Sequence, residues 1–181
     1  MYAKNNTRSN IEKLTIAAML VALQVVLANV LQVPLMEKQY NFGFIPIAAA
    51  GALLGAPWAM AVGALGDFLG AHIFPQGAYF PGFTLTNLLV GLVCGLVLYR
   101  KKPSLIRCII VVAVSLAGLN LFLNSLWLSI LYSSNGRSYW GWVVMRAPNY
   151  LIEVPANILL TFLTLQGLKK MKLPATLALR D

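Results

Sequence analysis

The chain has 181 residues, of which 59% are hydrophobic and only 10% are charged. Soluble domains contain about 45–50% apolar and about 25% charged residues, so this composition excludes an ordinary soluble enzyme and a disordered tail. We expect one domain over residues 1–181, an all-α integral membrane protein. The formal net charge is +9, but no basic, aromatic surface segment accompanies it. We therefore interpret the charge as a topology signal and an attraction to the lipid bilayer, with no nucleic-acid site.

Five apolar stretches are predicted to cross the bilayer as six helices, because about 20 apolar residues span its core. The first stretch follows a basic flank but lacks a small-residue cleavage site, which predicts an uncleaved helix. The second is interrupted by Gly55-Ala56-Pro57, and proline suits the first turn of a new helix, which predicts two helices joined by a tight turn. The predicted helices are 14–33, 44–55, 57–74, 83–99, 106–132 and 150–168.

The distribution of basic residues predicts the topology. With both termini in the cytoplasm, the inner segments hold 11 of the 14 Lys and Arg residues, and the outer connections hold Lys38, Arg137 and Arg146. A five-helix bundle would place one basic terminus outside, against the positive-inside rule. We therefore expect a six-transmembrane-helix bundle with cytoplasmic N and C termini.

The predicted outer connections, 34–43, 75–82 and 133–149, are longer than the inner ones and richer in Pro, Gly, Asn and aromatic residues. Two prolines and two glycines in 75–82 exclude regular helix there. Irregular backbone near a membrane is tolerated where it is buried in protein or lines a cavity. We interpret the outer face as one that captures a ligand, with a plain interfacial loop as the alternative.

Two polar residues lie in the third predicted helix. Asp67 stands among glycines and alanines, where a structural hydrogen bond is favoured over catalysis. His72 is the only histidine and lies near the outer end. One His and one Asp make neither a metal site nor a nucleophile–base pair, so we expect no metal and no catalytic residue.

Polar stripes on the last two predicted helices suggest a ligand pocket. Asn120, Asn124 and Trp127 are spaced to share one helical face, which can hydrogen-bond and stack on a flat heterocycle. Bonding of these amides between helices is an equally good interpretation. Asn149, Glu153 and Asn157 form a second stripe, one turn after Arg146, and a salt bridge or amide bond inside the bundle is the alternative for Glu153. The candidate substrate-binding residues are His72, Tyr79, Phe80, Asn87, Asn120, Asn124, Trp127, Arg146, Asn149 and Glu153.

Several motifs are absent from the sequence. There is no GxxxxGK[ST] phosphate-binding loop, no HExxH and no GxSxG. We therefore expect a non-enzymatic binding subunit without a cofactor, which takes its energy from partner proteins. Ala18 and Ala22 form a small-xxx-small pattern suited to close helix packing, either with a partner or within the chain.

Three segments carry a resemblance to a known family: NFGFIPIAAAGALLG (41–55), GALGDFLGAHIFPQGAYFPGFTLTN (63–87) and NLFLNSLWLSILY (120–132). They resemble the S components of energy-coupling factor (ECF) vitamin transporters, and the block FPQGAYFPGFTLT resembles the folate-type branch. The resemblance implies a six-helix protein of the bacterial plasma membrane that binds a vitamin from outside. It also implies a transmembrane coupling subunit (EcfT) and two cytoplasmic ATPases (EcfA and EcfA') as partners, with Ala18 and Ala22 matching the family's docking pattern.

One departure from the folate-type pattern concerns the cargo. Folate-type members often carry a basic residue late in the first helix, where this chain has Asn29. Folate is a dianion, so we expect folate uptake and retain uptake of pantothenate, a smaller monoanion, as the alternative. An intramembrane enzyme that uses Asp67, His72 or Glu153 is a hypothesis of a different class, and a purely structural membrane partner is another.

Overall fold

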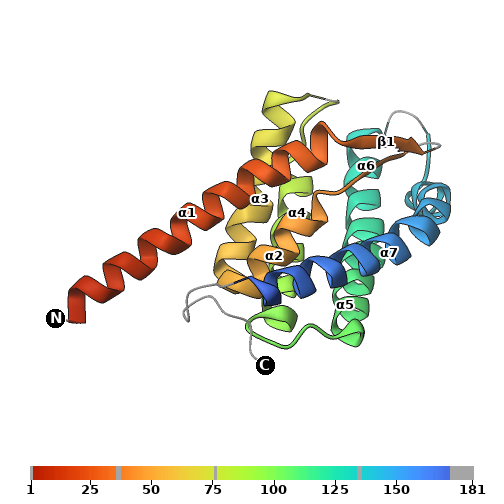
Figure 1. Cartoon of the computed structure of the whole chain (residues 1–181). Coiled ribbons are helices and arrows are strands. Elements are labelled where there is room, and N and C mark those ends of the chain that lie inside the picture. The colour runs from red at the N-terminus through yellow and green to blue at the C-terminus, as the bar shows by residue number, and fades with distance from the viewer. Residues whose placement is uncertain (1, 36–37, 76, 134–135, 172–181) are drawn as a thin grey trace.

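A computed structural model of the chain describes the backbone of residues 2–35, 38–75, 77–133 and 136–171, and within these ranges the side chains of 10–32 and of 40 onward. The described part is helical apart from one hairpin and short connections (Figure 1). The first helix, α1 (Tyr2–Asn29), lies across the other helices and extends past them at its N-terminal end.

A short antiparallel hairpin follows α1. It consists of β1 (Gln32–Leu35) and β2 (Lys38–Asn41), with Val33 opposite Tyr40. The sequence predicts only an irregular connection over 34–43. Cross-strand pairing satisfies backbone groups that would otherwise lack partners close to a membrane.

The next two helices are α2 (Phe44–Leu54) and α3 (Ala56–Ile73). Gly55 joins them at φ +93°, a conformation that glycine adopts without steric cost, and Pro57 lies in the first turn of α3. The tight turn is therefore located where the sequence predicts it. Ten of the 11 residues of α2 are buried, so this helix forms the centre of the bundle.

Helix α4 (Pro81–Leu98) packs with its backbone against α3. A Cβ atom on Gly91 would collide with the backbone of Ala59, and one on Gly95 would collide with that of Ala56. Small residues allow helices in membranes to approach this closely and gain van der Waals contact. The pair α3–α4 therefore forms one rigid wall of the molecule.

The stretch from 105 to 131 is one continuous helix with a widened middle. It begins as α5 (Leu105–Val112), continues as the π-helical η1 (Ala113–Leu123) and ends as α6 (Asn124–Leu131). The sequence predicts a regular helix over 106–132. A π-helix bonds residue i to i+5 and is common at functional sites, and apolar periodicity does not distinguish it from an α-helix.

The last described helix, α7 (Tyr139–Lys170), begins at Tyr139 instead of at the predicted residue 150. Ser138 caps it by accepting a hydrogen bond from the Gly141 N–H at 3.3 Å. Pro148 and Pro155 lie inside the helix. Neighbouring helices can compensate for the hydrogen bonds that an internal proline removes in a membrane protein.

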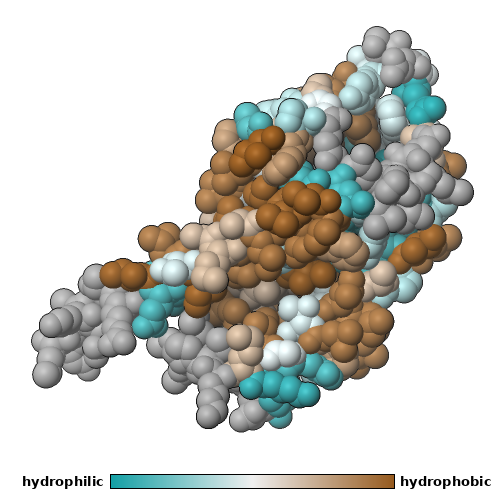
Figure 2. Space-filling view, turned by 45° about the horizontal axis from the view of Figure 1, so that its top comes forward, coloured by the Kyte–Doolittle hydropathy of each residue, from teal (hydrophilic) through white to brown (hydrophobic). Residues whose placement is uncertain are grey.

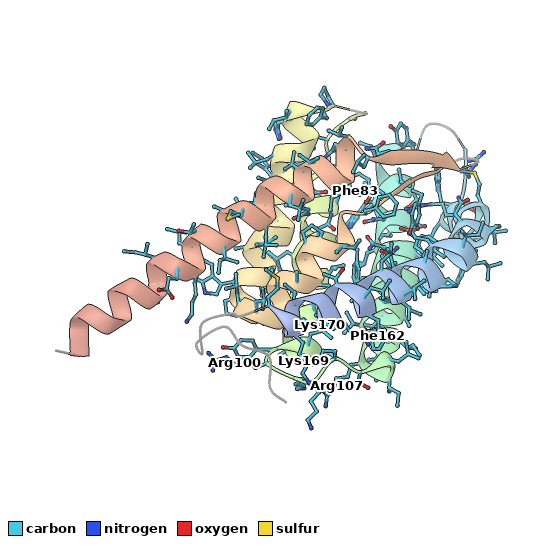
Figure 3. The ribbon with its side chains drawn as sticks, viewed as in Figure 1. Phe83, Arg100, Arg107, Phe162, Lys169 and Lys170 are labelled. Carbon is cyan, nitrogen blue, oxygen red and sulfur yellow. The ribbon has the colours of Figure 1, made fainter. Side chains whose placement is uncertain are left out.

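Four described helical segments are long and apolar enough to cross a membrane, namely Asn10–Asn29, Pro81–Leu98, Leu105–Leu131 and Tyr139–Lys170. Hydrophobic residues cover much of the visible face, and hydrophilic residues form smaller patches among them (Figure 2). We call the end with β1–β2 and residues 77–80 the hairpin end. We call the other the basic end, because Arg100, Arg107, Lys169 and Lys170 lie there (Figure 3).

Candidate functional site

A cavity of about 410 Å³ lies inside the bundle towards the hairpin end. Side chains from α1, α2, α3, α4, η1, α6 and α7 line it together with residues of both strands. Its polar lining residues are mostly uncharged, namely Gln24, Asn29, Gln32, Asn41, Asn87, Asn120 and Asn124, with Asp67 and Glu153 as the two acidic ones. Phe44, Phe74, Tyr79, Phe83 and Tyr132 add aromatic surface.

Asp67 organises the α3–α4 wall of the cavity. Its carboxylate accepts a hydrogen bond from the Thr84 hydroxyl at 2.6 Å and one from the Asn87 side-chain amide at 2.8 Å. The single Thr84 proton is then in use, so the Tyr79 hydroxyl, 3.0 Å from Thr84, must be the donor in that pair. A chain of hydrogen bonds thus holds Tyr79, which precedes α4, to the carboxylate in the bundle interior.

The amides of Asn120 and Asn124 lie together on the η1–α6 wall. Asn124 Nδ2 donates to Asn120 Oδ1 at 3.0 Å, so part of the hydrogen bonding between these amides occurs within one helix. Both residues also line the cavity. In this pair the amide bond thus lies within one helix and not between helices, and ligand contact by the two amides stays a prediction.

Trp127 and Phe80 lie next to the cavity but are not among its lining residues. The indole N–H of Trp127 donates to Thr86 Oγ1 at 3.0 Å, and its ring packs against Phe80 at a centroid distance of 5.7 Å. A Cβ on Gly82 would collide with the Trp127 ring, so the glycine creates the space for it. This contact joins α6 to the start of α4 behind the cavity wall.

Of the predicted residues on α7, only Glu153 lines the cavity. Arg146 is 8% exposed, and its guanidinium donates to Ser125 Oγ at 3.5 Å and to the Tyr150 hydroxyl at 3.4 Å. Asn149 is equally buried. The structure therefore places Arg146 and Asn149 inside the bundle beside α6 but outside the cavity lining.

His72 and Arg137 are exposed and are not among the residues that line the cavity. His72 is exposed, its Nδ1 is 2.7 Å from the Phe68 carbonyl oxygen, and its ring packs against Tyr79 at 5.0 Å. Arg137 stacks its guanidinium over the Trp142 ring at 4.9 Å. The Lys38 side chain lies outside the described residues.

The hairpin contributes a titratable group next to the cavity. Burial and the nearby Glu153 carboxylate raise the pKa of the Tyr40 hydroxyl above its usual value. Tyr40 therefore stays protonated at neutral pH. Among the described residues, no group of three His, Cys, Asp or Glu side chains is arranged to hold a metal ion.

Sequence reasoning missed several polar lining residues, of which Gln24 is the most buried at 3% exposure. It lies in an apolar run on α1, and a single polar residue there gives no periodic signal. Gln32 and Asn41 were missed because they line the cavity from the unpredicted strands.

Comparison with known proteins decides the family. The chain matches the family described as ECF transporter, substrate-specific component, over residues 12–165. The chain belongs to that family. As an ECF substrate-specific component it is a subunit of a transporter and a multi-pass membrane protein, so the hypothesis of an intramembrane enzyme is not retained.

The relatives of this ECF component include folate transporters. It is 40% identical to the folate transporter FolT of Clostridium novyi over 114 residues, which are 63% of this chain and 66% of the relative. It is 30% identical to FolT of Leuconostoc mesenteroides over 170 residues, 92% of this chain and 89% of the relative. A crystal structure of FolT bound with folic acid superposes with a TM-score of 0.77 at 27% identity, covering 93% of this chain and 96% of that one.

Proposed function

We propose that this protein is the folate-binding substrate-specific component of an ECF importer. The observation that carries the proposal is the amide- and aromatic-lined cavity of about 410 Å³, in a chain whose relatives are folate transporters. Known ligand pockets measure about 300–1,000 Å³ and combine apolar walls with a few placed polar groups. No relative or neighbour described above favours pantothenate.

The cavity lining suits a flat, nitrogen-rich ring. Aromatic side chains such as Phe83 and Tyr79 offer faces for packing, and amides offer both donors and acceptors. The carboxylate of Asp67 is already bonded to Thr84 and Asn87. We assign it the role of fixing the α3–α4 wall so that the amides keep one orientation.

The charged end of folate then belongs at the hairpin end. Asn29 lines the cavity where a folate-type protein often carries a cation, and its Nδ2 donates to the Val25 carbonyl oxygen at 2.9 Å. Without a cation among the lining residues described, a dianionic tail is best accommodated near water. Arg137, at the exposed start of α7, can attract that tail through long-range electrostatics.

We propose six membrane crossings, with the hairpin end outside and both termini in the cytoplasm. The basic residues between α4 and α5 and at the end of α7 share one end of the molecule, as the positive-inside rule requires (Figure 3). Lys172 and Arg180, which also enter the prediction, lie outside the described residues. Helix α2 measures only about 16 Å, which is too short to cross a hydrocarbon core of about 30 Å by itself.

We further propose that α1 docks the protein to a transmembrane coupling subunit, which two cytoplasmic ATPases energise, in the plasma membrane of a bacterium. Ala18 and Ala22 are exposed on α1, whereas the adjacent Ala17 is 6% exposed and packs into the bundle. The small exposed face is thus free within the described structure to receive another helix.

Ligand binding by the purified protein tests the proposed function. Isothermal titration with folic acid should give nanomolar-scale affinity, and excess pantothenate should not displace the bound folic acid. Mass spectrometry of ligand that co-purifies should detect a pteridine. Lack of folic acid binding, or displacement by pantothenate, would refute the proposal.

A further inference from the structure

A second cavity lies at the basic end, where the turn between α2 and α3 meets the end of α4. It measures about 460 Å³ and is more open than the first. We call it the basic-end groove, and its lining residues are Leu54, Gly55, Ala56, Pro57, Trp58, Gly95, Leu96, Tyr99 and Lys101. None of them lines the first cavity, so a ligand of this groove does not depend on the proposed folate function.

Most of the surface in the basic-end groove is apolar or aromatic. The backbone of α4 touches that of α3 here, because a Cβ on Gly95 would collide with Ala56. The larger side chains are Trp58, Leu96 and Tyr99, of which Leu96 is 63% exposed and Tyr99 is 38% exposed. Tryptophan and tyrosine are enriched where a membrane meets water. The groove therefore has the composition of a site at the level of the lipid headgroups.

Lys101 is the one charged residue among the described residues that line the groove. The side chain is exposed, and its ammonium donates to the Leu96 carbonyl oxygen at 3.3 Å. An ammonium has three donors, so this bond leaves others for an anion. The charge is thus located beside the apolar surface.

The backbone next to the groove is held in an unusual conformation. Arg100 adopts φ +49°, in the left-handed region that residues with a side chain rarely occupy. Its N–H donates to the Ala52 carbonyl oxygen of α2 at 3.0 Å, and the Arg107 guanidinium donates to the Lys102 carbonyl oxygen at 2.9 Å. Such strain is often found at functional sites. Here it fixes the segment that carries Lys101.

The surroundings of the groove are strongly basic. The segment 99–107 contains no acidic residue and four cationic ones, namely Arg100, Lys101, Lys102 and Arg107. Lys169 and Lys170 lie at the same end of the molecule (Figure 3). The proposed topology places this end in the cytoplasmic leaflet, where basic pockets between membrane helices bind anionic headgroups.

We propose that the basic-end groove binds one anionic phospholipid. Its phosphate lies at the Lys101 ammonium, and an acyl chain packs against Leu96 and the aromatic side chains. A lipid with a zwitterionic headgroup is disfavoured, because its own ammonium would face the surrounding cations. A lipid fits this groove better than a partner helix does, since the exposed small residues that allow close helix packing are on α1.

Native mass spectrometry of the purified full chain tests the inference. The protein is titrated with equal amounts of phosphatidylglycerol and phosphatidylethanolamine that carry the same acyl chains, and wild type should prefer phosphatidylglycerol. Lys101→Gln should lower that preference about fivefold, the effect of one basic residue beside an anionic lipid surface. Lys102→Gln is the matched control. It removes the same charge from the next residue, which is exposed but does not line the groove, and should keep most of the preference.

A second variant tests the apolar part of the groove. Leu96→Asn places an amide in the path of the acyl chain and should reduce the amount of either lipid bound. Because Leu96 is mostly exposed, the variant should fold, and its Tm verifies this.

Three outcomes would overturn the inference. Wild type may bind both lipids equally, or Lys102→Gln may lose as much preference as Lys101→Gln, which would show diffuse attraction to the whole basic surface. Lipid binding may also be unchanged in Lys101→Gln and Leu96→Asn while both fail to co-purify with the coupling subunit, which would show that the groove receives that protein. None of these results affects the titration with folic acid, which tests the proposed function separately.

Discussion

The Asp67 network predicts a measurable loss of stability in Thr84→Val. The substitution keeps the shape of the side chain but removes the bond to Asp67 at 2.6 Å and the bond from Tyr79 at 3.0 Å. Hydrogen bonds to charged groups contribute about 1.5–3 kcal/mol, whereas polar contacts between membrane helices average about 0.6 kcal/mol. We therefore expect the free energy of unfolding to fall by about 1–2 kcal/mol.

For a chain of this length, that loss corresponds to a decrease in Tm of about 2–8 °C. Tryptophan fluorescence during heating in detergent measures it, with and without folic acid. Thr84→Ser retains the hydroxyl and should restore most of the Tm. Thr164→Val is the matched control, because the hydroxyl of Thr164 bonds the Leu160 carbonyl oxygen of its own helix and no other described residue. If Thr84→Val and Thr164→Val unfold at the same temperature, the Asp67 network does not stabilise the α3–α4 wall.

Three further predictions concern docking, the α4–α6 contact and pH. Ala18→Trp should bind folic acid normally but fail to co-purify with the coupling subunit, and retained assembly would exclude α1 as the docking face. Trp127→Phe loses the bond to Thr86 and should lower stability by about 0.5–1.5 kcal/mol in a melting experiment, whereas an unchanged Tm would show that this bond contributes nothing. The pKa of Tyr40 is raised in the folded state, so the stability it contributes is present below about pH 10 and is lost as pH rises through the folded-state pKa. Tyr40→Phe should therefore show a shallower decrease of Tm at high pH than wild type, and parallel profiles would contradict the assignment.

The sequence predicts those parts of the fold that local chemistry determines. Gly55 and Pro57 mark the turn between α2 and α3 because each has a backbone preference that does not depend on its neighbours. The interpretation of Asp67 as a residue with structural hydrogen bonds matches its bonds to Thr84 and Asn87.

Other features depend on contacts that no local pattern encodes. Pro148 usually indicates a helix end, but α7 continues through it. The hairpin lacks the alternation of a half-buried strand pair. The spacing of Asn120, Asn124 and Trp127 assumes a uniform α-helix, whereas the π-helical η1 ends between the first two of them. In the structure Trp127 bonds α4 while the amides line the cavity.

The cavity residues also divide into those that the sequence predicts and those that only the tertiary structure shows. Asn87, Asn120, Asn124, Tyr79 and Glu153 are recognisable because polar side chains in apolar helices are costly and require a reason. Their membership of a folate site is still a prediction. Gln24 meets the same criterion but stands alone in an apolar run, and its packing against Gly66 of α3 becomes visible only in the structure.

Helix α1 presents Ala18 to its surroundings and, six positions later, Gln24 to the interior. The two positions are only about 9 Å apart along the helix axis. Under the proposed roles, the bound folate would therefore lie on one side of α1, and the coupling subunit would lie on the other side of the same helical segment. A sub-ångström shift of α1 on ligand binding would therefore act directly on the coupling subunit, without a chain of intervening residues.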